Sequence, residues 1–291
     1  MGLPPAVALA TCAEMPALDG EGRLLLAALR GLGVRAEAEI WNARPAGGWA
    51  AYDLVLPRAT WDYTFMLPRF LAWAGDLGER LCNAPKVVAW NADKGYLLDL
   101  AQAGVATIAT ERLAPGAAFA PPPGRFVVKP AVAAGSRGAA VFDEQRHVAA
   151  RAHVAELHDG GHDVLVQPYL DAVDGAEAET ALVFLDGALS HAMRKGPLLA
   201  LDIAPPDGLY RAEDMRRAEP GDDIVALGLQ AHAYVEERFG RPLYARVDIL
   251  RDEHGRPSVL ELELIEPSLF LDFAPGSAGA LARAIVARLS A

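Results

Sequence analysis

The sequence predicts an α/β fold, in which a small parallel unit precedes a larger region that contains an antiparallel hairpin. Short apolar strands alternate with helical patterns over roughly residues 1–85, which is typical of a parallel sheet packed against helices. Much later, the apolar segments 244–250 and 258–267 flank the run DEHGRP, whose Asp, Gly and Pro residues favour a turn. The two segments therefore indicate a hairpin.

The N-terminal unit is expected to hold three strands and two helices. Leu24, Leu25, Ala28 and Leu29 lie on one helical stripe, which ends at Gly33. The expected strands are 6–11, 34–40 and 52–57, and the expected helices are 21–32 and 67–77.

The rest of the chain follows the same reasoning. A helix is expected over 91–103 with Asn91 as its N-cap, and the Pro-rich run 115–124 is a predicted connector. A long polar loop is expected over 202–222. The remaining expected elements are strands at 125–130, 163–169, 179–185 and 188–194, a further strand after a Gly-containing loop at 131–138, helices at 148–157 and 223–239, and a C-terminal helix.

Composition limits the function classes. About half of the residues are apolar and 22% are charged, as in an ordinary globular protein with a sizeable core. The net charge of −11 argues against a nucleic-acid or anionic-membrane partner. Cys12 and Cys82 form no metal-binding motif, and no apolar run is long enough to span a bilayer. We expect a cytoplasmic protein, with a homodimer among the possible assemblies.

Three carboxylates in the hairpin suggest a metal site. Alternation places Glu261 and Glu263 on one face of their strand, and Asp248 lies in the other strand. Acids that converge on one face repel each other, and a hard cation such as Mg²⁺ would remove that repulsion. The alternative is a solvated strand face, which is disfavoured because both strands are otherwise apolar.

A second motif suggests phosphate binding. Lys129 ends a strand and precedes a small-residue loop with Gly135, Ser136 and Gly138, whose backbone N–H groups can approach a polyphosphate closely. Taken alone, this pattern also fits a surface hairpin. Only four residues of the chain are lysine, however, and Lys94 and Lys129 are two of them.

The segment VLVQPYL (164–170) is an apolar strand that runs into Gln167 and Pro168. Such a segment can present backbone groups to the edge of an adenine ring. A simple buried strand is the alternative.

In this order, Lys94, VVKP, the Gly/Ser loop, QPYL, Arg194, RVD and LELE resemble the ATP-grasp superfamily of carboxylate–amine ligases. The resemblance covers about residues 86–275, and Arg246 precedes Asp248 as in the Arg-x-Asp pattern of these ligases. It implies an α+β ATP-grasp fold: a Rossmann-like pre-ATP-grasp domain at 1–88, then a two-part ATP-grasp domain with a central and lid part at 89–166 and a metal-binding part at 167–291.

The resemblance also implies roles for individual residues. ATP and Mg²⁺, with two ions expected, would be the cofactors, and Arg194 and Arg246 would face the γ-phosphate and the reacting carboxylate. Gln167 replaces the Glu that is frequent at this hinge, and either Asp174 or Glu177 would hold the ribose. The remaining implied ATP contacts are Lys94, Lys129, loop 131–138, Pro168, Tyr169 and Leu170, and the implied metal ligands are Asp248, Glu261 and Glu263.

Four segments resemble a narrower family, that of the cyclo-ligase that closes O-ureido-D-serine to D-cycloserine. They are RATWDYT, WNADKGYLLDL, ETALVFLDGALSHAMRKGP and LELELIEPSLFL. RATWDYT follows a predicted strand, where α/β folds place ligand loops. Arg58 would clamp a substrate carboxylate and Asp62 an amino group, whereas Trp61 and Tyr63 would contact substrate or pack between domains.

The leading hypothesis is therefore an ATP-dependent C–N ligase that acts on a small amino acid through an acyl phosphate. One alternative is an intermolecular amino-acid or dipeptide ligase of the same fold. Another is an ATP-binding regulatory protein without turnover, which the presence of all three acids and both arginines disfavours.

Overall fold

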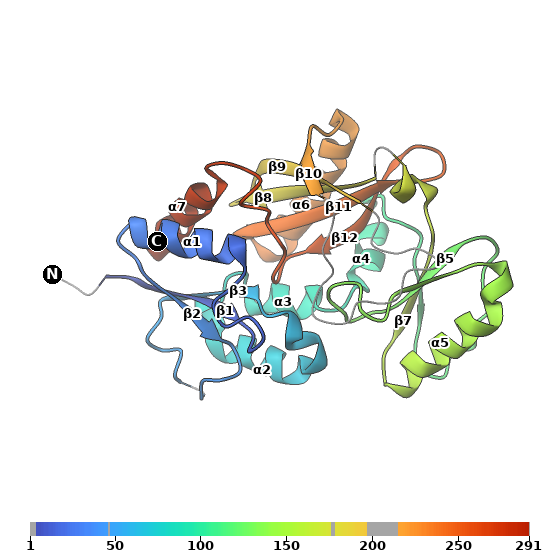
Figure 1. The fold of residues 1–291 in the computed structure, drawn as a ribbon, viewed down its shortest axis with the longest axis horizontal. Coiled ribbons are helices and arrows are strands. Elements are labelled where there is room, and N and C mark those ends of the chain that lie inside the picture. Colours follow the sequence, from blue (N-terminus) through green and yellow to red (C-terminus); the bar gives the residue numbers. More distant parts are fainter. Residues whose placement is uncertain (1–3, 46, 176–177, 197–214, 291) are drawn as a thin grey trace.

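The computed structural model describes residues 4–45, 47–175, 178–196 and 215–290, and these form three sheets (Figure 1). The first sheet has the order β2-β1-β3 and is parallel, as predicted. Its strands are β1 (Ala6–Thr11), β2 (Arg35–Ile40) and β3 (Leu54–Ala59).

Helices cover both faces of this sheet. Val7 and Leu9 of β1 pack with α1 (Gly20–Gly31) and with the C-terminal helix α7 (Ser277–Leu289), while Ala8 and Ala10 face α2 (Leu67–Leu77) and an aromatic cluster. The strand alternates between two cores, which explains why its sequence is apolar throughout. The predicted elements of this unit are all present, with ends within two residues of those expected.

The second sheet is antiparallel, in the order β10-β9-β8-β11-β12. Its β11–β12 hairpin confirms the predicted one and pairs Asp248 with Glu261 and Arg246 with Glu263. Helix α6 (Asp222–Phe239) packs on the face that carries Leu262 and Val247. The strands are β8 (Glu179–Leu185), β9 (Ala188–Lys195), β10 (Met215–Ala218), β11 (Tyr244–Arg251) and β12 (Pro257–Glu263).

The loop expected over 202–222 needs a correction at its end. Residues 202–214 lie outside the described part, but 215–218 form β10, which pairs with β9. The polar sequence MRRA resembles a loop because an edge strand has one exposed side.

The third sheet forms a separate lobe with the order β4-β7-β5-β6 (Figure 1). Helix α5 (His147–Asp159) packs against it through Ala150 and Val154. The strands are β4 (Glu111–Leu113), β5 (Phe126–Pro130), β6 (Ala140–Phe142) and β7 (Val164–Pro168). Short 3-10 helices along the described chain are Trp61–Phe65, Gly78–Arg80, Glu144–Arg146 and Asp171–Asp174. Because β7 crosses residue 166, we propose that the domain boundary predicted there lies after Pro168.

The single helix expected over 91–103 is wrong. The chain forms α3 (Pro85–Asn91) and α4 (Tyr96–Gln102), and Asn91 ends the first helix instead of capping the second. Its side chain donates to the carbonyl of Leu262 (2.8 Å) and accepts from the N–H of Leu264 (2.8 Å). Asn91 is thus used to bind the outer edge of β12, a long-range contact that the local sequence cannot reveal.

Asn83 joins the first unit to the second sheet in a similar way. Its amide donates to the carbonyls of Tyr244 (2.9 Å) and Leu264 (2.8 Å) and accepts from the N–H of Leu243 (2.7 Å). The side chain is buried, so all three hydrogen bonds are shielded from water. The N-terminal unit and the second sheet are therefore firmly connected. No helix in the described part of the chain is long and apolar enough to cross a membrane.

Candidate active site

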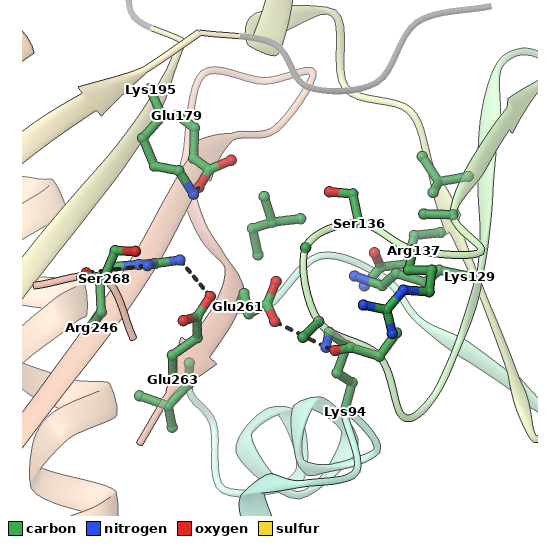
Figure 2. Close-up of a pocket in the computed structure, with 18 of the residues that line it drawn as sticks. Lys94, Lys129, Ser136, Arg137, Glu179, Lys195, Arg246, Glu261, Glu263 and Ser268 are labelled. Carbon is green, nitrogen blue, oxygen red and sulfur yellow. Dashed lines mark hydrogen bonds and ion pairs between the residues drawn. The ribbon is translucent and has the colours of Figure 1, made fainter. Parts of the chain in front are cut away.

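A cavity of about 370 Å³ lies where the second and third sheets face each other (Figure 2). Acidic and basic side chains from β8, β9, β11 and β12 form one wall, and β5 with the loop that follows it forms the other. We call these the acid wall and the loop wall. The charged lining residues are Asp19, Lys94, Lys129, Arg137, Glu179, Lys195, Arg246, Glu261, Glu263 and Glu266.

Charges on the acid wall are closely paired. Arg246 binds Asp248 (Nε to Oδ1, 2.8 Å) and forms an ion pair with Glu263. Lys195 binds Asp248 (3.2 Å) and Glu179 (2.6 Å). Burial alone would raise the pKa of Asp248, but Arg246 and Lys195 lower it, so this carboxylate stays ionised.

An excess of negative charge nevertheless remains on this wall. Burial raises the pKa of Glu263 to about 7, with repulsion from Glu261 and Asp248 adding to it and Arg246 opposing it. No three acidic, histidine or cysteine side chains come close enough together, within the described ranges, to hold a metal ion as they stand. The donors are all carboxylate oxygens, however, and added positive charge would relieve their repulsion. The chemistry of this donor set fits Mg²⁺.

Lys94 connects the two walls. Its ammonium group donates to the carbonyl of Ala133 in the loop (2.5 Å) and lies 3.1 Å from Glu261. Glu261 raises the pKa of Lys94, although burial opposes this effect, so the lysine is charged.

Lys129, at the end of β5, lines the cavity without an ion pair among the described residues. Burial lowers the pKa of Lys129 to about 8, with repulsion from Lys94 in the same direction and attraction to Glu261 opposing both. A buried ammonium without a close counter-ion would gain from an anionic ligand.

The loop after Lys129 has left-handed backbone at two of the residues that line the cavity. Gly135 and Ser136 line the cavity with φ of 62° and 58°, and Ser136 accepts this conformation although it carries a Cβ atom. Gly138 (φ 71°) does not line the cavity. A Cβ atom there would lie 3.1 Å from Pro130, so this glycine shapes the base of the loop.

The predicted hinge contributes to the apolar part of the cavity lining, which we call the apolar slot. Gln167, Pro168, Tyr169 and Leu170 all line the cavity together with Ile108, Val127 and Leu260. The side chain of Gln167 donates to Thr110 (2.9 Å) and is thus already engaged.

The structure describes one of the two predicted ribose ligands. Asp174 accepts a hydrogen bond from Tyr169 (2.8 Å) and lies outside the lining. Glu177 lies outside the described residues.

Two of the four predicted substrate residues line the cavity and two do not. Trp61 and Tyr63 line the cavity, whereas Arg58 and Asp62 do not. Arg58 is 2% exposed and binds Glu21 (2.5 Å) and the carbonyl of Pro267 (2.8 Å). Because β3 continues to Ala59, Arg58 lies within the strand and not in the loop beyond it.

Asp62 is also used internally. It accepts a hydrogen bond from the indole N–H of Trp41 (2.7 Å) and one from Asn42 (3.4 Å). Arg58 and Asp62 therefore make contacts within the protein and do not lie in the cavity, where they were expected to contact the substrate.

Arg246 lines the cavity as expected, but Lys195 does so in place of its neighbour Arg194. Successive residues of a strand point to opposite faces. Lys195 shares the face of Met193, whereas Arg194 shares that of Ala192, which packs on the α6 side of the sheet. The resemblance located the correct strand but chose the residue on the wrong face.

Sequence reasoning also missed Arg137, Glu179 and Glu266, which line the cavity. Arg137 falls within the Gly/Ser loop, and Glu179 begins a strand, so each lies beside a motif that was recognised. Glu266 follows the acidic strand, and no pattern in the sequence distinguishes it from a solvated acid.

Solved structures with this fold belong to ATP-grasp ligases. D-alanine–D-alanine ligase from Bacillus anthracis has a TM-score of 0.66 at 13% identity, over 99% of this chain and 98% of that one. A RimK domain ATP-grasp protein from Sphaerobacter thermophilus DSM 20745 has a TM-score of 0.65 at 18% identity, over 97% and 99%. At these identities the likeness shows the fold, and it confirms the predicted ATP-grasp architecture.

Higher similarity identifies the family. The crystal structure of D-cycloserine synthetase DcsG has a TM-score of 0.87 at 33% identity, over 98% of this chain and 99% of that one. Cycloserine biosynthesis protein DcsG of Streptomyces lavendulae is 35% identical over 301 residues, which cover 97% of this chain and 98% of the relative. The family model for the N-terminal domain of D-cycloserine synthetase DcsG matches residues 7–83. The chain belongs to the DcsG family and is an ATP-dependent ligase.

Proposed function

We propose that this ligase closes O-ureido-D-serine to D-cycloserine, with Mg²⁺ as its metal. Family membership supports this proposal, since DcsG is a D-cycloserine synthetase at 33% identity over almost the whole chain. One observation of the site carries it further: a single cavity joins an apolar slot, two lysines beside a glycine loop and a carboxylate wall. These are the parts needed to hold ATP beside a second, small substrate.

In the first step, a carboxylate oxygen of the substrate attacks the γ-phosphorus of ATP, and ADP leaves. Lys94 and Lys129 hold phosphate oxygens, and the backbone at Gly135 and Ser136 approaches them. Arg246 faces the reacting carboxylate and neutralises charge on the transferring group. The product is an acyl phosphate.

In the second step, the ureido nitrogen that is bonded to oxygen attacks the acyl carbon. The C–N bond closes the ring, phosphate leaves with the C–O bond pair, and the nitrogen loses its proton. Addition of water to the carbamoyl group then releases carbamic acid, which decomposes to carbon dioxide and ammonia. An attached nucleophile has a high effective concentration, which favours ring closure over hydrolysis of the acyl phosphate.

Asp248, Glu261 and Glu263 would hold Mg²⁺, which supplies charge neutralisation to the phosphates when bound. The ion would also compensate the excess negative charge of the acid wall, since the pKa of Glu263 is raised to about 7 without it.

Mass spectrometry of reactions with ATP, Mg²⁺ and O-ureido-D-serine tests the function. We expect ADP and D-cycloserine in equal amounts. A linear dipeptide from added amino acids, with no cyclised product from the ureido compound, would establish the intermolecular alternative instead. A cytoplasmic location and a homodimer stay predictions, to be checked by cell fractionation and light scattering.

A further inference from the structure

Glu266 differs from every other carboxylate that lines the cavity. Glu179 is paired with Lys195, Glu261 with Lys94 and Glu263 with Arg246, and Asp19 accepts the backbone N–H of Gly22. Glu266 is 9% exposed, and no donor among the described residues binds its carboxylate. Because a buried carboxylate is costly to ionise unless it is paired, a cation that enters the cavity would be stabilised beside Glu266.

Two side chains of the N-terminal unit hold the backbone that follows Glu266. Arg58 donates to the carbonyl of Pro267 (2.8 Å), and Glu21 accepts the N–H of Leu269 (2.8 Å). Glu21 and Arg58 are themselves a buried ion pair on the N-terminal unit. Glu266 is therefore fixed at the cavity wall, which is the arrangement expected of a binding group.

Aromatic side chains in the same cavity are suited to a small organic cation. Trp61, Tyr63 and Phe270 line the same cavity, and aromatic rings attract ammonium groups. The charge of Glu266 also acts on Tyr63. Burial raises the pKa of Tyr63 well above its ordinary value, and Glu266 is the charge that adds most to this shift.

We propose that Glu266 binds the α-ammonium group of the amino-acid substrate. The identity of that substrate rests on the proposed function, whereas the need for a cation rests on the cavity itself. Burial raises the pKa of Glu266 to about 8 in the ligand-free protein, so an entering ammonium replaces a proton and restores the ionised form.

The pairing has a consequence for the reaction. An ammonium held by a carboxylate has no lone pair and cannot attack an acyl phosphate. With the α-amino group held in this form by Glu266, the ureido nitrogen is the nucleophile of the bound substrate. The same contact favours binding of amino acids over simple carboxylic acids.

The test compares O-ureido-D-serine with the same compound lacking its α-amino group, using wild type, Glu266→Gln and Glu266→Asp. For the wild type we expect kcat/KM to be about a thousandfold lower for the compound without the amine. Glu266→Gln should remove most of that preference by losing activity on O-ureido-D-serine alone. Glu266→Asp keeps the charge and should retain part of the preference. ATP affinity and the Mg²⁺ concentration needed for half-maximal rate should not change.

Two results would overturn the assignment. One is an equal loss on both compounds in Glu266→Gln. The other is a shift in Mg²⁺ requirement with the preference for the amine intact, which would make Glu266 a metal ligand.

Failure of the proposed function would be visible separately. If the wild type neither binds nor converts the ureido compound, a binding assay replaces the kinetic comparison. Calorimetry in the presence of a non-hydrolysable ATP analogue then compares amino acids with the same compounds lacking the α-amino group. A preference for the amines that Glu266→Gln abolishes would still support the assignment, and its absence in the wild type would reject it.

Discussion

The acid wall and the loop wall of the cavity handle charge in opposite ways. On the acid wall, Asp248 is held by both Arg246 and Lys195, so its carboxylate is fixed in position by ion pairs. On the loop wall, within the part of the chain that the structure describes, Lys129 has no ion pair and the buried Nη2 group of Arg137 has no hydrogen-bond partner. The acid wall thus pairs most of its charges within the protein and keeps an excess of negative charge, whereas the loop wall carries a buried cation that would gain from an anion.

The largest expected effect is on the acid wall. Glu261→Gln removes a negative charge without changing shape, and we expect turnover to fall about a thousandfold or more with the fold intact. Glu253→Gln, at an acid whose side chain is 82% exposed, is the matched control. ADP release and circular dichroism check both variants, and near-normal Mg²⁺-dependent ADP release by Glu261→Gln would remove it from the metal site.

The next largest effect is on the loop wall. Lys129→Ala should weaken ATP binding by about 10- to 100-fold, because it deletes a charge-assisted contact to phosphate. Stability should not fall, because no ion pair is lost. Calorimetry with ATP measures the affinity. Lys86→Ala is the control, since Lys86 lies over the ring of Phe239, away from the cavity; equal affinities in both variants would contradict the phosphate role.

A smaller effect is expected where the loop meets the N-terminal unit. Arg137 donates to Thr64 (3.0 Å), and its guanidinium lies 4.0 Å from the centre of the Phe65 ring. Arg137→Ala should lower kcat/KM about tenfold by loosening this contact. Arg151→Ala, on the exposed face of α5, serves for comparison. Steady-state kinetics decide, and identical values for the two variants would show that the contact does not matter for turnover.

The smallest expected effect is the uptake of a proton when ATP binds. The pKa of Lys129 is lowered to about 8 in the free protein, and a bound phosphate would raise it again. ATP binding at pH 8 should therefore take up about half a proton, and affinity should decline as pH rises through this value. Calorimetry in buffers of different ionisation enthalpy measures the uptake. Lys129→Arg should abolish it, and uptake that persists in this variant would assign the proton to another group.

Local patterns predicted the parts of the site that depend on local geometry. The two-residue period of a strand brings Glu261 and Glu263 to one face, and the small residues after Lys129 indicate a loop close to phosphate. Arg194 was chosen over Lys195 because the resemblance marks a strand but not the face that meets the cavity.

Long-range contacts account for the rest. Arg58 binds the carbonyl of Pro267 across 209 residues of sequence, and Asn91 binds β12 across more than 170. The partner of a polar side chain at such separations depends on how the sheets dock. The sequence therefore offered no means to see that Arg58 supports the segment beside Glu266, or that Glu266 would lack a partner.

Asn83 has a consequence for engineering by recombination. One side-chain amide connects the N-terminal unit to three backbone groups in and beside the sheet that carries Asp248, Glu261 and Glu263. Its partners are main-chain atoms, so they are present whatever side chains occupy those positions. A chimaera that takes residues 1–88 from another ligase should therefore keep an asparagine at this position, together with apolar side chains that fill the core shared with the second sheet and α7. Exchange of this unit would replace Trp61 and Tyr63, which line the cavity, and would leave Glu266 and the lobe of the third sheet unchanged.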